Sequence, residues 1–591
     1  MTEAQEIAKK CAERARQLLA TGQLDAARVE LNQGLKQFPD NVQMLQILAD
    51  VLDAGNHVAQ AITVCDRLGL LCPNDAMLRA KAGQIWERSG DFARAENAYQ
   101  VALTIDPNND VAAQGLINIW GRAGQISDLK SLLRKRAKTV RDPQVRAANL
   151  FNAAFTQPVI AKSNKEIESC RQELTAAVSV KPSSPFQDPF KLGLSPNFYL
   201  GYQARNDRSL QESLASYYLA ATPSLAGVAP HVGSRSNPAK IKVGILSRYF
   251  AKHTVGYLSY GLVSLLDRQR FDVTLFRAPH GPRDGGTPRF LEAAPLVDLP
   301  PDLTLARREI AKAKLDVLHF PEIGMDGLTY FLAFSRLATL QTVAWGHPIT
   351  TGIPNIDLFL SCDAMEPENS EAHYSERLMR LKTLTFCGEK PPEPEPYQLQ
   401  VDPTRPSYLC AQSLYKVHPD FDATLAALLR ADPKGIIYFV SFMPYADQLL
   451  QTRLAERLGA DIERVRFLPR MTTRQFLHLS GNVDVILDVP QWAGGKTSLE
   501  AFAMGTPVVH WPGEFMRGRH TLAFYKRMGI EAPVVASSDA YVATATRLVH
   551  DSGFRKDIRA QIVANSPKLF NDVASIREIE DVWEAALRER C

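Results

Sequence analysis

The chain has 591 residues and a formal net charge of +4, and 45% of its residues are hydrophobic. This length predicts two to four domains, and the composition is ordinary for a globular protein. So small a net charge does not indicate a nucleic acid or a membrane surface as the partner.

The first residues, MTEAQEIAKKCAERARQLL, form the pattern of a charged amphipathic helix, and no apolar run approaches the roughly 18 residues of a membrane span. The eight cysteines, from Cys11 to Cys591, are scattered without CxxC or CxxH spacing. We therefore expect free thiols in a cytoplasmic protein, with neither a membrane span nor a signal peptide and without a zinc site.

Residues 1–140 carry an internal repeat. Pro39, Pro73 and Pro107 are each 34 residues apart and open the similar phrases PDN, PND and PNN. This is the tetratricopeptide period, in which small residues let paired helices approach and proline ends the second helix. A weaker unit surrounds Gly124. Such an array presents a concave surface to peptides or proteins, and the alternative is a purely structural or dimerising array.

Residues 141–238 are expected to be a helical connector and linker. SVKPSSPFQDPF predicts a loop, NFYLGYQARNDRSLQESLASYYLAA predicts a helix, and TPSLAGVAPHVGSRSNPAK predicts a polar linker.

From residue 239 short β-rich runs alternate with helical stretches, which predicts two Rossmann-like halves, 239–395 and 396–591. The first half has expected strands at 241–246, 271–276, 315–320, 339–344 and 356–361. The second has them from Tyr408 and at 436–440, 465–468, 483–487 and 507–510. The proline-rich stretch 391–406 links the halves, and 570–590 predicts a closing helix. The fold class is therefore an α-solenoid followed by an α/β pair of the GT-B glycosyltransferase type, with its active site between the halves.

The stretch 483–521 is the most informative in the chain. An apolar run stops at Pro490, Gly494 and Gly495 allow close backbone approach, and Lys496, Thr497 and Ser498 begin a helix that Thr497 or Ser498 can cap. Such a helix start binds anions, and a nucleotide phosphate is the usual one at a strand end. An ordinary capped βα turn is the alternative. GGKTS is not a Walker A motif, because Pro490 stands where that motif needs glycine.

Other polar residues follow strands. His253 comes after the first strand, Asp316 and His319 lie near the start and end of another, and Lys416 follows the strand at Tyr408. The loop GHPITTG, with His347 and Thr350, is suited to lining a cleft. A lysine at a strand end can neutralise a leaving diphosphate. The alternatives are a surface histidine at 253, a satisfied core histidine at 319 and a solvated lysine at 416.

The chain resembles the O-GlcNAc transferase and SPINDLY-type proteins of glycosyltransferase family 41, in both the repeats and the region from about 190 onward. The phrases that carry the resemblance are VGILSRYFAKHT, LDVLHF, WGHPITTG, HYSERL, LYKVHPD, DVILDVP, GGKTSLEAFAMGTPVV and PGEFMRGR. It implies a metal-independent, inverting transfer of a sugar from a nucleotide-sugar to Ser or Thr hydroxyls of a protein.

The resemblance also implies roles for individual residues. The catalytic group is His253, Asp316, His319 and Lys416, with Asp316 as a proton relay. The donor-binding group is Arg470, Met471, Gly494, Gly495, Lys496, Thr497, Ser498 and Glu500. Further cleft residues are His347, Thr350, Ser413, Glu514 and Arg519.

The chain departs from the family pattern where Gly495-Lys496-Thr497 replaces a His-Thr-Thr run and Ser413 replaces a glutamine. These changes bear on the base and the sugar of the donor. UDP-GlcNAc is the first expectation, with GDP- and CMP-sugars as alternatives, and no cofactor or metal is expected. The acceptor is expected to be a protein held in the repeat groove, such as a flagellin or another bacterial protein, and homodimerisation stays open.

Two other functions compete with the protein glycosyltransferase. One is a non-catalytic tetratricopeptide scaffold with a nucleotide-binding GT-B domain. The other is a transferase that acts on a small glycan acceptor. Lys416, the histidines and the glycine loop argue against the first, and the repeat array argues against the second.

Overall fold

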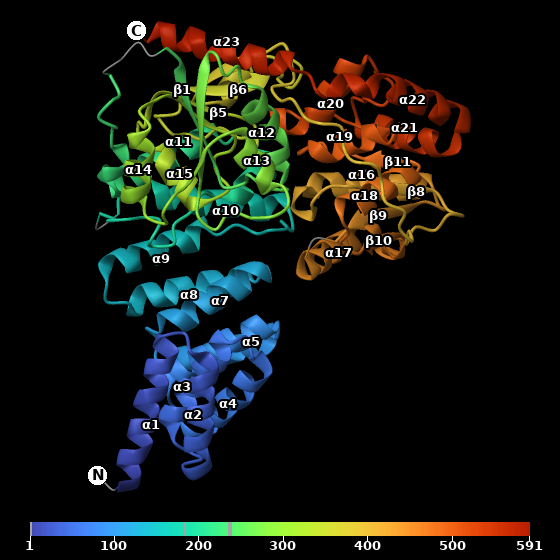
Figure 1. Ribbon diagram of the computed structural model, residues 1–591. Coiled ribbons are helices and arrows are strands. Elements are labelled where there is room, and N and C mark those ends of the chain that lie inside the picture. The colour runs from blue at the N-terminus through green and yellow to red at the C-terminus, as the bar shows by residue number, and fades with distance from the viewer. Residues whose placement is uncertain (1–2, 183–184, 234–238, 442, 591) are drawn as a thin grey trace. The chain divides into compact units, whose positions relative to one another are not determined.

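The computed structural model describes residues 3–182, 185–233, 239–441 and 443–590. The chain forms two compact units, Met1–Ala153 and Ala154–Cys591 (Figure 1). Ser183 and Ser184 of the expected loop, residues 234–238 of the expected linker, and Cys591 lie outside the described residues.

The first unit consists of helix pairs with the predicted period. The helices are α1 (Glu3–Ala20), α2 (Leu24–Gln37), α3 (Val42–Ala54), α4 (Val58–Leu71), α5 (Ala76–Ser89), α6 (Phe92–Ile105), α7 (Asp110–Arg122), α8 (Ile126–Thr139) and α9 (Pro143–Phe155). Pro39, Pro73 and Pro107 each stand two residues beyond the end of a second helix, which confirms the repeat. Gly124 lies in the turn of the fourth pair, α7 and α8.

Two glycines of the repeats are explained by one aromatic ring. Tyr99 of α6 is only 1% exposed, and its hydroxyl donates to Glu87 at 3.0 Å. A Cβ atom on Gly83 of α5 would come within 2.5 Å of this ring, and one on Gly115 of α7 would also collide with it. Glycine at both positions therefore allows three consecutive helices to close around Tyr99.

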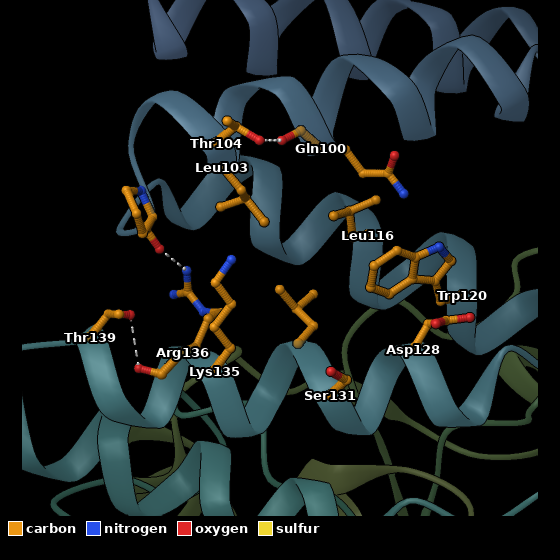
Figure 2. A pocket seen from close by; sticks show the side chains of 12 residues that line it. Gln100, Leu103, Thr104, Leu116, Trp120, Asp128, Ser131, Lys135, Arg136 and Thr139 are labelled. Carbon is orange, nitrogen blue, oxygen red and sulfur yellow. Dashed lines mark hydrogen bonds between the residues drawn. The ribbon is translucent and has the colours of Figure 1, made fainter.

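A cavity of about 270 Å³ opens between α6, α7 and α8 (Figure 2). Leu103, Leu116 and Trp120 line it from α6 and α7, and they face the side chains of α8, among them Lys135 and Arg136. Arg136 is buried and pairs with Asp110, whereas Lys135 is exposed at the rim. We call this cavity the repeat pocket.

The connector between the repeats and the sheets belongs to the second unit. Its elements are α10 (Asn164–Val178), the 3₁₀ turn η1 (Phe198–Gln203), α11 (Arg208–Ala221) and the 3₁₀ turn η2 (Pro223–Ala226). The single helix expected from 197 onward is therefore wrong, because the chain breaks after η1, where Ala204 has a left-handed φ of +52°. Asp207, just beyond this break, pairs with both Arg171 and Arg517.

The first sheet has seven parallel strands in the order β3-β2-β1-β4-β5-β6-β7. They are β1 (Ile241–Ser247), β2 (Phe271–Arg277), β3 (Leu296–Asp298), β4 (Leu315–Phe320), β5 (Ala338–Val343), β6 (Leu358–Cys362) and β7 (Arg377–Leu381). The helices are α12 (Thr254–Leu265), α13 (Thr287–Ala293), α14 (Leu303–Lys312) and α15 (Gly327–Ala333). The five expected strands are confirmed. The sequence missed β3 and β7, which are the two edges and carry no long apolar run.

The second sheet has five parallel strands in the order β10-β9-β8-β11-β12. They are β8 (Ser407–Cys410), β9 (Ile436–Val440), β10 (Val465–Leu468), β11 (Val485–Leu487) and β12 (Val508–Val509). The helices are α16 (Asp422–Ala431), α17 (Pro444–Leu458), α18 (Thr473–Asn482), α19 (Lys496–Ala503), α20 (His520–Met528), α21 (Ser538–His550) and α22 (Ser552–Asn565). Residues 391–406 contain neither helix nor strand, as expected of the linker.

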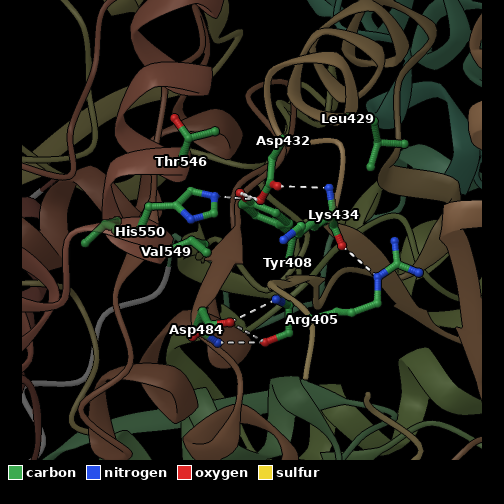
Figure 3. Close-up of polar contacts among 12 residues, drawn as sticks. Arg405, Tyr408, Leu429, Asp432, Lys434, Asp484, Thr546, Val549 and His550 are labelled. Carbon is green, nitrogen blue, oxygen red and sulfur yellow. Dashed lines mark hydrogen bonds and ion pairs between the residues drawn. The ribbon is translucent and has the colours of Figure 1, made fainter. Parts of the chain in front are cut away.

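The amino-terminal end of this sheet is closed by a polar network (Figure 3). Asp432 accepts from the Tyr408 hydroxyl at 2.8 Å and contacts His550 Nε2 at 3.0 Å. Asp484 accepts from the backbone N–H and the hydroxyl of Ser407, both at 2.9 Å. Because these carboxylates are engaged with neighbouring strands and helices, they stabilise the end of the sheet away from the expected active site.

The last helix, α23 (Ala574–Glu589), packs on the first sheet (Figure 1). Trp583 is fully buried against Phe271, and Glu580 and Glu584 pair with Arg270 at the start of β2. The sequence-based boundaries placed this helix in the second half. In the structure this helix packs on the first sheet instead, because its apolar face is complementary to that sheet.

No helix within the described residues is long and apolar enough to cross a membrane. Seven of the eight cysteines lie in the described part of the chain, and each of them is a free thiol.

Candidate active site

Each sheet has one point where the strand order reverses, and polar loops gather at both. β1 lies between β2 and β4, and β8 lies between β9 and β11. Ligands of open α/β sheets bind at the carboxyl ends of the strands at such points. His253 follows β1 and His319 ends β4, while Lys416 follows β8 and the glycine loop follows β11.

A cavity of about 180 Å³ lies at these strand ends, and we call it the central cleft. The connector contributes Tyr202, the first half contributes His253 and His347, and the second half contributes Lys416 and Lys496. Ser413, Gly495 and Thr497 also line it. The structure therefore brings together predicted residues from both halves.

His253 begins α12 as its N-cap. Its Nδ1 accepts the backbone N–H of Val255 at 3.2 Å, and its ring stacks on Tyr249 with centroids 4.1 Å apart. Burial, with a contribution from the Lys496 ammonium, lowers the pKa of His253 to about 4. The ring is therefore neutral at pH 7 and carries its proton on Nε2, so it acts as a hydrogen-bond donor from that atom.

The other two histidines are more deeply buried. His319 is 2% exposed, its Nδ1 contacts the Thr342 hydroxyl at 2.9 Å, and it lines a small cavity of about 30 Å³ that shares Trp345 and Gly346 with the central cleft. His347 lines the central cleft and stacks on Phe198. Burial lowers the pKa of each imidazole to about 3, so both are neutral at physiological pH.

Lys416 is a half-buried cation of the central cleft. Its Nζ donates to Gln412 Oε1 at 3.2 Å and lies 5.8 Å from the centre of the Trp492 ring. Burial lowers the pKa of Lys416 to about 8, and the Asp488 carboxylate opposes that shift. An ammonium with one neutral partner in a cleft is well suited to receive an anion.

The glycine loop has the expected close packing but a different cap. A Cβ atom on Gly494 would come within 2.2 Å of the Ser498 hydroxyl and 2.7 Å of the Gln412 amide, so a larger residue there would displace these side chains. The expectation that Thr497 or Ser498 caps α19 is wrong, because the N-cap is Gly495 and it makes no side-chain cap bond. Ser498 is buried and contacts the Thr521 hydroxyl at 2.8 Å, while Thr497 faces the cleft.

A second cavity of about 220 Å³ adjoins the central cleft, and we call it the adjacent pocket. Arg470, Met471 and Glu500 line it, which groups these predicted donor-binding residues. Glu500 is buried and accepts from Lys496 Nζ at 2.6 Å, and burial raises its pKa while Lys496 opposes the shift. The two cavities adjoin, because they share four lining residues, Gln412, Ser413, Lys496 and Thr497.

Seven predicted residues line neither cavity; His319, Gly494 and Ser498 are described above, and the other four are Asp316, Thr350, Glu514 and Arg519. Asp316 lies at the amino end of β4, where its carboxylate accepts the Lys242 backbone N–H at 2.9 Å. Thr350 is buried and donates to Glu376 at 2.7 Å. Glu514 is exposed, and Arg519 donates to the Gly513 carbonyl at 3.1 Å. The structure thus separates Asp316 from His319 across the length of one strand.

The structure adds cleft residues that the sequence reasoning missed. Tyr202 and Trp492 stack with centroids 4.0 Å apart, and His520 packs on Trp345 at 4.8 Å. Gln412 connects Lys416 to the glycine loop. Only Gln412 had a signal in the sequence, because it is the second residue after the strand β8. The aromatic residues come from segments whose approach depends on tertiary packing.

Among the residues that the structure describes, no group of three or more His, Cys, Asp or Glu side chains is arranged to hold a metal ion.

Comparison with known proteins agrees with this geometry. The model of glycosyl transferase family 41 matches residues 400–576, and a tetratricopeptide repeat model matches residues 18–85. These segments include the whole glycine loop, Lys416 and the first helix pairs. One segment of the chain thus matches the glycosyl transferase family 41 model and another matches the tetratricopeptide repeat model, in agreement with the resemblance that the sequence motifs carry.

Two relatives illustrate the similarity. The chain is 28% identical over 269 residues to the probable UDP-N-acetylglucosamine--peptide N-acetylglucosaminyltransferase SPINDLY of Solanum lycopersicum, covering 43% of this chain and 28% of that protein. It is 24% identical over 350 residues to the UDP-glucose:protein N-beta-glucosyltransferase of Actinobacillus pleuropneumoniae serotype 5b (strain L20), covering 57% and 54%. The match thus spans about a quarter to a half of these relatives.

Among solved structures, a Lys-to-Met variant of the Thermobaculum terrenum O-GlcNAc transferase is similar over 100% of this chain and 99% of its own, with a TM-score of 0.54 and 21% identity. This similarity confirms the expected fold, in which helical repeats precede a GT-B pair of parallel sheets.

Proposed function

We propose that this chain is a protein glycosyltransferase that moves a sugar from a nucleotide-sugar to a side-chain hydroxyl of a protein acceptor. The observation that carries the proposal is that two adjoining cavities share Lys496 and Thr497 as lining residues, beside Lys416. A nucleoside fits the adjacent pocket, its diphosphate lies at the two lysines, and the sugar extends into the central cleft.

The donor we expect first is UDP-GlcNAc, with GDP- and CMP-sugars as alternatives. The printed names of the two relatives specify UDP-N-acetylglucosamine and UDP-glucose, which supports a UDP-sugar. We assign Arg470 and Met471 to the base and Glu500 to the ribose, and their shared position in the lining of the adjacent pocket supports this assignment. Glu500 is engaged by Lys496, so donor binding must redistribute that ion pair.

In the reaction, an acceptor hydroxyl oxygen attacks the anomeric carbon of the sugar from the face opposite the diphosphate. The bond from carbon to the diphosphate oxygen breaks, the diphosphate keeps the electron pair, and the configuration inverts. Lys416 and Lys496 stabilise the charge that develops on the leaving oxygen, which is usually the largest contribution to catalysis. This arrangement supports a transfer that is independent of a metal ion.

The histidines orient the reactants in this mechanism. His253 donates from Nε2, because its Nδ1 is occupied by the Val255 N–H. We assign the hydroxyl proton to an oxygen of the departing phosphate, since Asp316 lies at the opposite end of β4. A base must come within hydrogen-bond reach of the proton that it removes.

The acceptor is proposed to dock on the repeats. Tetratricopeptide arrays bind extended peptides, and the repeat pocket offers an apolar floor with Lys135 at its rim (Figure 2). An acceptor segment with an aliphatic side chain next to a carboxylate fits these features. A cytoplasmic location for this reaction is part of the proposal, since nucleotide-sugars are soluble co-substrates.

The proposal is tested by a donor screen with the purified full chain. UDP-, GDP- and CMP-sugars are incubated with host-lysate proteins, and nucleotide release and intact-mass shifts are measured with and without EDTA. Lys416→Ala should lose most of both signals with the active donor, and Lys434→Ala, which replaces an exposed lysine at the far end of the sheet, should keep them. EDTA should change neither. Absence of release and of a mass shift with every donor would overturn the proposal.

A further inference from the structure

Three polar residues form a row along the carboxyl edge of the second sheet. His510 directly follows β12, Asp488 directly follows β11, and Gln412 is the second residue after β8. These strands are consecutive neighbours in the order β8-β11-β12. The row therefore runs from the interior of the second half to Lys416, whose Nζ donates to Gln412.

Asp488 is the centre of this row and has no exposed side-chain surface. Its Oδ1 accepts from the backbone N–H groups of Val489 at 3.1 Å and Gly494 at 2.8 Å, and from the Gln412 amide at 3.2 Å. Its Oδ2 lies 2.8 Å from His510 Nδ1. Four donors around two oxygens match an ionised carboxylate, which accepts hydrogen bonds and donates none.

This carboxylate decides how the Gln412 amide is oriented. Because the NH₂ group of Gln412 donates to Asp488, its Oε1 is left to face the Lys416 ammonium. The same NH₂ group lies 3.3 Å from the Thr497 hydroxyl at the start of α19. A reversed amide would turn its NH₂ group toward the ammonium and repel it.

His510 lies behind Asp488 and is also fully buried. An ionised carboxylate needs a donor at this position, so His510 carries a proton on Nδ1. Its Nε2 is buried without a hydrogen-bond partner in the described structure. A buried polar atom of this kind costs free energy, which is tolerated here because His510 holds Asp488 in place.

We propose that Asp488 is a positioning residue of the donor site, which aligns Lys416 through the Gln412 amide and fixes the glycine loop through the Gly494 N–H, with His510 as its support. The inference rests on the proposed function, because it assigns Lys416 and the glycine loop to the donor diphosphate. Asp488 itself lines neither the central cleft nor the adjacent pocket.

The chain offers a matched control in Asp484. Asp484 and Asp488 flank the same short strand, and both accept hydrogen bonds from residues of the β8 segment. Asp484 accepts a hydrogen bond from Ser407 at the amino end of the sheet, whereas Lys416 follows the carboxyl end. Replacing either aspartate by asparagine removes one buried or half-buried charge, but only Asp488→Asn should disturb the donor site.

The first measurement is steady-state turnover of UDP-GlcNAc by the full-length chain and its variants, together with their melting temperatures. Asp488→Asn should lower kcat/KM about 100-fold, the loss that follows from misplacing a catalytic group by about 1 Å. Asp484→Asn should stay near the wild type in kcat/KM. If Asp488→Asn fails to fold, Gln412→Leu, which leaves the Asp488, Gly494 and His510 contacts intact, should show the loss.

The second measurement does not depend on enzyme activity. Acetylation of Lys416 by acetic anhydride is followed by peptide mass spectrometry from pH 6 to 10. The charges acting on its ammonium are Asp488 and Cys410, with His520 close by and Lys496 in the same cleft. Asp488→Asn should move the midpoint to lower pH, and Asp484→Asn should not.

The outcomes separate the two proposals. Equal kcat/KM and equal Lys416 midpoints in the wild type and Asp488→Asn would overturn the positioning role, even if the enzyme is active. A shifted midpoint in a chain that turns over no donor would support the alignment of Lys416 and would count against the proposed function alone.

Discussion

Lys496 and Glu500 lie one turn apart on α19, with the lysine nitrogen 2.6 Å from a carboxylate oxygen. The side chain of Glu500 is 5% exposed and that of Lys496 is 26% exposed. Lys496 lines both the central cleft and the adjacent pocket, whereas Glu500 lines the adjacent pocket alone. The cation that we assign to the diphosphate is thus partly neutralised before any donor binds.

We predict that Lys496→Met destabilises the chain by about 2 kcal/mol, because it leaves the Glu500 carboxylate buried without its partner. The loss is below that of a fully buried pair, since Lys496 is partly exposed. The double variant Lys496→Met/Glu500→Leu should recover most of the stability in urea unfolding without recovering UDP affinity. A double variant as unstable as the single one would show that the pair is not the cause.

The pKa of Lys416 predicts how kcat/KM falls at alkaline pH. Burial lowers its pKa to about 8, so the ammonium is charged below this pH and loses its proton as the pH rises through it. Since kcat/KM reports the free enzyme, it should fall with a midpoint near pH 8. The residual activity of Lys416→Ala should not fall near this pH, because the variant has no lysine to lose its proton. An unchanged wild-type rate up to pH 9.5 would contradict the assignment.

His253 combines a structural and a functional role, which two substitutions can separate. Asparagine is a good N-cap, so His253→Asn should keep the bond to the Val255 N–H and a wild-type melting temperature. It should still lose most of kcat, because the Nε2 donor is gone. His253→Ala should lose kcat and also about 1 kcal/mol of stability. If His253→Asn kept full activity, the Nε2 atom of His253 would have no role in the mechanism.

The repeat pocket provides a test of acceptor selection. Lys135 lines this pocket, while Lys138 is exposed on the same helix and does not line it. Lys135→Glu should raise KM for the protein acceptor severalfold through charge repulsion and leave donor hydrolysis without acceptor unchanged. Lys138→Glu serves as the control. Equal acceptor KM values in both variants and the wild type would locate acceptor binding elsewhere.

Much of the fold could be predicted because it rests on local periodicity. The 34-residue spacing of Pro39, Pro73 and Pro107 specified the helix pairs, and apolar runs located the buried strands, since parallel strands are covered on both faces. The edge strands β3 and β7 escaped prediction, because they are short or partly exposed and carry no such run.

The candidate site was predictable where a residue lies in the segment that follows a strand. His253, Lys416 and Lys496 meet in the central cleft because the carboxyl ends of parallel strands share one edge of a sheet. Asp316 showed the limit of this reasoning. Asp316 and His319 are close in sequence but lie apart in the structure, because an extended strand advances about 3.3 Å per residue.

The sequence by itself therefore determined the repeat period, the strand–loop–helix motifs and the kinds of side chain at strand ends. Only the tertiary structure decided which strands are neighbours, and with them the row from His510 through Asp488 to Gln412. It also brought Tyr202 of the connector onto Trp492, and α23 onto the first sheet. These contacts join residues far apart in the chain, and such pairings depend on packing that no local pattern encodes.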